Sequence, residues 1–156
     1  MRHQYKATID WKLSGPDFAK GQYSREHIWI FDGGFTIAAS PSPTIVPVPW
    51  SNPANVDPEE AFVAAIASCH MLTFLWLASR EGFTVVSYVD EAVGVMTKNE
   101  RGALWVSSVV LSPQVVWNGG RIPTAEEIAA LHHRAHEECF IANSVKTDIR
   151  VVPASI

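Results

Sequence analysis

The chain has 156 residues, the size of one compact domain, and we expect a single domain over residues 1–156. With 47% hydrophobic and 18% charged residues it can bury a core, which argues against a disordered protein. The net charge of −4 and the lack of any Lys/Arg run exclude phosphate-backbone binding, so we expect no nucleic-acid partner.

The first third of the chain has the pattern of short strands and loops. Residues 5–11 alternate in polarity like a strand. Residues 27–31 and 35–39 predict two further strands, joined as a hairpin through Asp-Gly-Gly at residues 32–34. Residues 40–58 form a proline-rich loop, and long loops of this kind are usually functional or cover an interface.

A long helix is predicted from Asp57 to about Arg80. Asp57 can cap the helix, Pro58 fits the first turn, and Glu59 lies at the positive end of the helix dipole. Gly82 then ends it. Since its residues are apolar nearly all round, we expect this helix to be buried on most sides.

Residues 61–79 of this helix contain no charged residue and are borderline in length for a membrane span. Because Ser68, Cys69, His70 and Thr73 lie in the middle, the segment is better explained as a buried core helix than as a membrane span, and we expect no membrane partner. The N-terminal sequence lacks the apolar run of a secretory signal, so we expect a cytoplasmic protein.

The second half predicts more strands. Residues 83–97 and 103–117 are two long strand-like segments, with a turn at 98–102 between them. Residues 147–152 predict a short last strand.

A second helix is predicted between these strands, at residues 124–142. Thr124 and Glu127 form a capping box, and the inward positions include Cys139 near the C-terminal end. The elements add up to an α+β fold, in which two helices pack on an antiparallel sheet of about six strands connected by hairpins.

The two cysteines, Cys69 and Cys139, are either inert buried thiols or redox-active ones, since a reducing cytoplasm disfavours a permanent disulfide. A thiol in apolar surroundings reacts only if a nearby cation favours the thiolate. The helix that carries Cys69 offers no cation before its last turn, so the cation must come from elsewhere. Arg25 is the best candidate and Lys20 the main alternative.

A zinc site is a further alternative. His132, His136 and Cys139 recur at i, i+4 and i+7 on the second helix, and the Cys69–His70 pair could join them. No fourth ligand is evident and the surrounding segment is polar, so we expect neither a metal nor another cofactor.

The sequence around Cys69 resembles the OsmC/Ohr family. In that family a Pro-Glu opens the central helix and a cysteine follows ten residues after the Glu, as Pro58-Glu59 and Cys69 do here. The segment at residues 135–139, followed by a short final strand, is similar to the segment that holds the family's second cysteine.

The resemblance implies an intertwined homodimer with its active sites at the interface. It also implies a peroxidase in which Cys69 attacks the peroxide, Cys139 is the resolving thiol, and Glu59 orients a catalytic arginine, here Arg25. The implied partners are an organic hydroperoxide substrate and a dithiol reductant, either a small molecule or a lipoyl-type protein.

One departure from the family pattern is Phe140, which follows Cys139 where much of the family has Pro. The departure bears on whether Cys139 reaches Cys69. The alternative function is a redox sensor or a binding protein for small hydrophobic molecules, without peroxidase turnover. The aromatic residues Trp50, Phe62, Phe74 and Trp76 are interpreted as core or interface rather than as substrate contacts.

Overall fold

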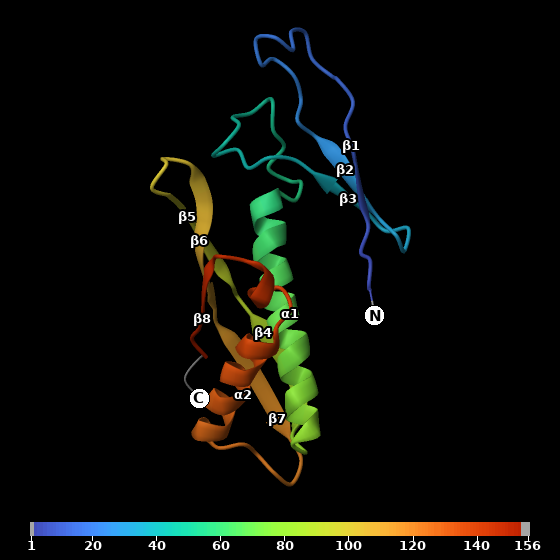
Figure 1. Ribbon diagram of the computed structural model, residues 1–156. Coiled ribbons are helices and arrows are strands. Elements are labelled where there is room, and N and C mark those ends of the chain that lie inside the picture. Colours follow the sequence, from blue (N-terminus) through green and yellow to red (C-terminus); the bar gives the residue numbers. More distant parts are fainter. Residues whose placement is uncertain (1, 154–156) are drawn as a thin grey trace. The chain divides into compact units, whose positions relative to one another are not determined.

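The computed structural model describes residues 2–153, which form two compact units that divide between Ala61 and Phe62. The long helix α1 begins in the first unit and continues into the second (Figure 1). Residues 1 and 154–156 of the predicted single domain lie outside the described residues, and the single-domain assignment stays a prediction.

The first unit contains a three-stranded antiparallel sheet of β1 (Ala7–Asp10), β2 (His27–Phe31) and β3 (Thr36–Ala39) in that order. The predicted β2–β3 hairpin is confirmed. Gly34 has a φ of 84° in the turn, a conformation that glycine adopts without a steric penalty.

The proline-rich loop that follows β3 is tied back to the sheet by hydrogen bonds. The Ser40 backbone N–H donates to the carbonyl of Val56 at 3.0 Å, and the Ser40 hydroxyl accepts from the Asn52 N–H at 2.8 Å. The side chains of Asn52 and Asn55 both donate to one carboxylate oxygen of Glu26. The loop is therefore held by polar contacts as well as by its prolines.

Helix α1 (Pro58–Arg80) starts and ends where its sequence predicts. The Asp57 carboxylate accepts from the Glu60 N–H at 2.7 Å, and the Glu60 carboxylate accepts from the Asp57 N–H at 3.3 Å, which is a capping box. At the other end Gly82, with a φ of 78°, closes the helix in a Schellman turn.

In the second unit, each of the two long predicted strands consists of two separate strands. The residues 83–97 divide into β4 (Thr84–Asp90) and β5 (Val93–Lys98), and the residues 103–117 into β6 (Leu104–Leu111) and β7 (Pro113–Asn118). β4 pairs with β7, and β5 pairs with β6, all antiparallel. The last strand, β8 (Asp148–Val151), pairs with β6 in parallel, so the sheet is not purely antiparallel as predicted.

A proline and a side-chain hydrogen bond lie at the break between these strand pairs. Pro113 has no backbone N–H and begins β7, a position that proline tolerates in a sheet. The preceding N–H, that of Ser112, donates to the carboxylate of Asp90 at 2.7 Å rather than to a strand carbonyl. A side chain thus replaces a ladder hydrogen bond at the bend.

Helix α2 (Ala125–Glu138) has the predicted capping box between Thr124 and Glu127. The helix is shorter than predicted, because Cys139 adopts an extended conformation and α2 ends at Glu138, four residues before residue 142. A single 3₁₀ turn, η1 (Ala142–Ser144), follows.

The strands of the second unit form two sheets, β4–β7 and β5–β6–β8, and both helices pack against these strands, which gives the α+β fold that the sequence predicts (Figure 1). One core cluster joins α1 to α2, side chains of β4 and β7 pack against it, and its buried residues are Phe74, Leu77, Ala78, Phe83, Leu131 and Ala135. A second joins α1 to β6 through Ile66, Val109 and Leu111, and side chains of β8 pack against it.

Helix α1 is less buried within the chain than its sequence predicts. It is long and apolar enough to cross a membrane, but a core helix passes the same test, so this is weak evidence for a span. An exposed stripe runs along it at four-residue spacing and consists of Ala64, Ser68, Leu72 and Trp76. Since one sheet and one short helix cover only part of a long helix, this stripe has no cover within the described chain.

Candidate active site

The second unit brings the two cysteines together. Cys69 lies near the middle of α1, and Cys139 is the C-cap of α2, with 1% of its surface exposed. Both thiols are free, and they lie near enough for Cys69 to contribute to the raised pKa of Cys139. The Ile141 N–H donates to the sulfur of Cys69 at 3.5 Å, and the Ala142 N–H donates to the sulfur of Cys139 at 3.4 Å. One turn of backbone therefore donates hydrogen bonds to both sulfurs.

Asn143 holds this turn in place. Its side-chain amide donates to the carbonyls of Glu137 and Cys139 at 2.7 and 3.0 Å, and its backbone N–H donates to the Cys139 carbonyl at 3.0 Å. The last carbonyls of a helix need such partners, because no intrahelical N–H reaches them. No motif in the sequence marks Asn143; the tendency of Asn to lie just past helix ends is the only signal.

The two thiols differ in their surroundings. Burial raises the pKa of Cys139 to about 11, and its hydrogen bond with Cys69 contributes in the same direction. The Ala142 N–H acts in the opposite direction, because it favours the thiolate. Cys69 is partly exposed and receives a backbone donor as well. At neutral pH Cys139 therefore keeps its proton.

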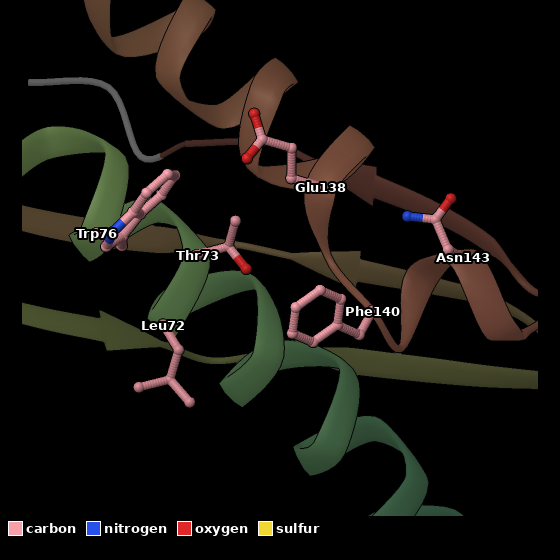
Figure 2. Close-up of a pocket in the computed structure, with 6 residues that line it drawn as sticks. All are labelled: Leu72, Thr73, Trp76, Glu138, Phe140 and Asn143. Carbon is pink, nitrogen blue, oxygen red and sulfur yellow. The ribbon is translucent and has the colours of Figure 1, made fainter. Parts of the chain in front are cut away.

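An apolar pocket of about 670 Å³ lies beside the turn after α2 whose N–H groups donate to both sulfurs, here called the cysteine turn. Its lining residues come from α1 and from the end of α2 with the segment that follows, and they are Leu72, Thr73, Trp76, Glu138, Phe140 and Asn143 (Figure 2). Trp76, which the sequence places in a core or interface, lines this pocket and is 56% exposed.

Phe140, the departure from the family pattern, does not separate the cysteines. The backbone turns at Cys139, and the Phe140 side chain lines the pocket with 81% of its surface exposed. Phe140 therefore lines the pocket while the N–H groups of Ile141 and Ala142 still donate to the two sulfurs.

Arg25 lies in the first unit and is partly buried. One of its guanidinium nitrogens, Nη1, donates to the carbonyls of Gly21 and Tyr23, each at 2.7 Å, and the guanidinium carbon lies 3.7 Å from the centre of the Tyr23 ring. With Trp11 and Phe18 it lines an apolar pocket of about 490 Å³. The position of the Arg25 guanidinium is thus fixed by backbone carbonyls of the segment just before β2.

Glu59 is partly buried in the first turn of α1. Over residues 2–153 no hydrogen bond or ion pair joins Glu59 to Arg25, and the orienting role of Glu59 stays a prediction. The alternative cation, Lys20, is exposed and pairs with Asp17 at 3.1 Å.

A metal site finds no support in the geometry. In the part of the chain that the structure describes, no group of three His, Cys, Asp or Glu side chains is placed to hold a metal ion. His132, one of the three residues at helical spacing, instead bonds to His70 on α1.

The sequence model of the family described as OsmC-like protein matches residues 51–153, which is 103 of the 156 residues and includes both cysteines. The chain belongs to the OsmC-like protein family. No significant match is found among curated proteins.

Solved structures of OsmC-like proteins have the same fold. An OsmC-like protein of unknown function from Vibrio cholerae is 51% identical with a TM-score of 0.94, over 97% of this chain and 99% of that one. An organic hydroperoxide resistance protein from Legionella pneumophila is 15% identical with a TM-score of 0.71, over 99% of this chain and 100% of that one. The organic hydroperoxide resistance protein OhrB of Bacillus subtilis is 17% identical with a TM-score of 0.66, over 97% and 98%.

Proposed function

We propose that this OsmC-like protein is a thiol-dependent peroxidase that reduces organic hydroperoxides. The observation that carries the proposal is that two successive backbone N–H groups of the turn after α2 donate to the sulfurs of Cys69 and Cys139. Two free thiols held by one turn are placed to interconvert between dithiol and disulfide by thiol exchange. The organic hydroperoxide resistance proteins among the solved structures agree in fold, and their low identity supports no more than the fold.

In the first step the Cys69 thiolate attacks the terminal oxygen of the hydroperoxide. The O–O bond breaks, the alkoxide takes up a proton and leaves as the alcohol, and Cys69 becomes a sulfenic acid. The Ile141 N–H, 3.5 Å from the Cys69 sulfur, can stabilise negative charge there.

In the second step Cys139 attacks the sulfenic sulfur of Cys69. A disulfide forms, and the sulfenic hydroxyl leaves as water with the proton of Cys139. Burial raises the pKa of Cys139 to about 11, so this proton has to leave during the step. A dithiol reductant, a small molecule or a lipoyl-type protein, then returns both thiols by exchange.

The apolar pocket supports an organic substrate over hydrogen peroxide. Leu72, Trp76 and Phe140 present hydrocarbon surface beside the cysteine turn. An alkyl or aryl group would bury apolar area there, at roughly 25 cal/mol per Å², which hydrogen peroxide cannot do.

Arg25 and Glu59 complete the proposal. A guanidinium favours a thiolate and stabilises charge that develops on the peroxide oxygens, and a carboxylate can hold it by bidentate hydrogen bonds. Arg25 suits this role better than Lys20, because it is partly buried and its position is fixed by two carbonyls.

We further propose that the protein acts as an intertwined homodimer in the cytoplasm. The exposed stripe of α1 supports the dimer, since Leu72 is 61% exposed in the single chain. A reducing compartment would keep both thiols available for the proposed cycle.

The proposal is tested by the intact mass of reduced protein after one equivalent of cumene hydroperoxide. Wild type should rapidly lose two hydrogens. Cys69→Ser should not change, and Cys139→Ser should gain one oxygen and stall there. Wild type that keeps its mass would refute the peroxidase, and a Cys139→Ser variant that recycles normally would refute Cys139 as the resolving thiol.

A second function, binding of a small hydrophobic molecule with redox sensing by the cysteines, is favoured by the size of the pocket, about 670 Å³. Native mass spectrometry of the purified protein distinguishes it. A co-purified apolar ligand together with thiols inert to peroxide would favour this function.

A further inference from the structure

A buried histidine pair connects the two helices that carry the cysteines. His70 on α1 and His132 on α2 are 1% and 3% exposed, and His70 Nε2 lies 3.0 Å from His132 Nδ1. The ring planes are nearly parallel, at 8°, and the ring centroids lie 5.3 Å apart, as expected for two imidazoles joined edge to edge by a hydrogen bond. His132 also stacks on Phe74 at 4.2 Å.

The pair is uncharged at neutral pH. Burial lowers the pKa of both His70 and His132 to about 4, and the neighbouring imidazole of each lowers it further: His136 for His70, and His70 for His132. One ring therefore donates and the other accepts, and the pair forms a hydrogen bond instead of a repulsive contact.

Stability alone does not explain this pair. The remaining ring nitrogens, His70 Nδ1 and His132 Nε2, are buried with no hydrogen-bond partner among residues 2–153. Whichever tautomer is present, one of these nitrogens is an N–H with no acceptor among these residues, which costs stability. An apolar pair of the same size would avoid this cost, but it would not fix the position of one helix against the other, since a hydrogen bond has a direction and apolar contacts do not.

The histidine pair lies close in sequence to both cysteines and can therefore affect how they are positioned. His70 directly follows Cys69, and His132 lies two turns before Cys139 on α2. A shift of α2 along α1 would separate the sulfurs and move the Ile141 N–H away from Cys69. We propose that the His70–His132 hydrogen bond positions Cys139 against Cys69 and thereby sets the equilibrium between dithiol and disulfide.

The proposal is tested by the redox equilibrium of the cysteine pair. The protein is equilibrated with mixtures of reduced and oxidised dithiothreitol, the free thiols are alkylated, and the oxidised fraction is read from the intact mass. No peroxide is needed, so this test can fail while the proposed peroxidase stands, and the reverse also holds.

His132→Leu removes the hydrogen bond and should lower the equilibrium constant for the disulfide at least tenfold, about 30 mV for this two-electron couple. His132→Asn places an amide near the position of Nδ1 and should stay within about threefold of wild type. The matched control is His133→Leu, since His133 is exposed on the next position of α2 and should leave the constant unchanged.

A role in stability alone predicts a different result. Destabilisation that affects the oxidised and reduced forms equally leaves the redox equilibrium unchanged. A His132→Leu constant equal to that of wild type would overturn the proposal. If His132→Leu does not fold, His132→Gln replaces it: its amide reaches the position of Nε2 instead of Nδ1, and equal constants for the Asn and Gln variants would overturn the proposal as well.

Discussion

At the scale of single residues, the two cysteines have different environments, and these suit different roles. Cys69 is partly exposed, whereas Cys139 is buried and receives its donor from Ala142. A nucleophile for a diffusing substrate has to be accessible, but a resolving thiol has to reach only one sulfur. The order of attack proposed above follows from this difference.

The protonation of Cys139 can be measured directly. In the Cys69→Ser variant, thiolate absorbance near 240 nm should rise with a midpoint above the ordinary value of 9 and at or below about 11, because burial, the larger cause, remains after the contribution of Cys69 is removed. A raised pKa favours the protonated form, so the thiolate appears only as pH rises. The baseline is a variant without either cysteine, and a midpoint at or below 9 would contradict the assigned environment.

Arg25 and Lys20 can be separated by mutation. Arg25→Ala should slow oxidation of Cys69 by cumene hydroperoxide at least a hundredfold, because it removes the proposed charge partner of the thiolate. Lys20→Ala is the matched control and should oxidise at the rate of wild type, since Lys20 is exposed and paired with Asp17. Single-turnover kinetics followed by intact mass give both rates, and the opposite ranking would transfer the role to Lys20.

At the scale of elements, the contact between α1 and the β5–β6 pair depends on a glycine. A Cβ on Gly94 would lie 2.5 Å from Cγ2 of Val63, closer than side chains in proteins approach each other. Glycine at this position therefore lets strand β5 approach the helix that carries Cys69.

Gly94→Ala should destabilise the fold by about 1 to 3 kcal/mol, the usual cost of inserting a methyl group into a packed contact. Gly120→Ala is the control, because nothing lies within 4 Å of its Cβ position. Urea denaturation of both variants measures the difference in the free energy of unfolding. Equal stability of the two variants would show that Val63 moves aside without cost.

At the scale of the whole molecule, α1 is the element that a single chain leaves incompletely covered. Leu72 and Trp76 are exposed on it, and both also line the pocket beside the cysteine turn. A second copy that covers the stripe would exclude water from these side chains and bring the cysteine site to the interface.

The proposed dimer predicts a single species of twice the chain mass in sedimentation at micromolar concentration. Trp76→Glu should weaken association at least tenfold, because it puts a charge into apolar surroundings. Phe35→Glu is the control, an equally drastic change at an exposed position in the β2–β3 turn. A well-folded wild-type monomer would exclude the intertwined architecture.

The sequence by itself determined the local structure. Asp57 and Gly82 mark the ends of α1, Thr124 marks the start of α2, and the Asp-Gly-Gly turn marks the first hairpin. These features are readable because caps and turns depend on residues only a few positions apart. The same holds for the family resemblance, because the motif from Pro58-Glu59 to Cys69 lies within one helix.

Only the tertiary structure decided which of these elements meet. At the break of the long strands, Ser112 donates a hydrogen bond to Asp90, which lies 22 residues earlier in the chain. Strand β8 pairs in parallel with β6, and the alternation of polar and apolar residues in β8 does not predict the direction of that pairing. The sequence contains Cys69, Cys139 and His132, but residues this far apart meet only through the packing of α1 against α2. Packing depends on the shapes of many side chains at once, and no local pattern specifies it.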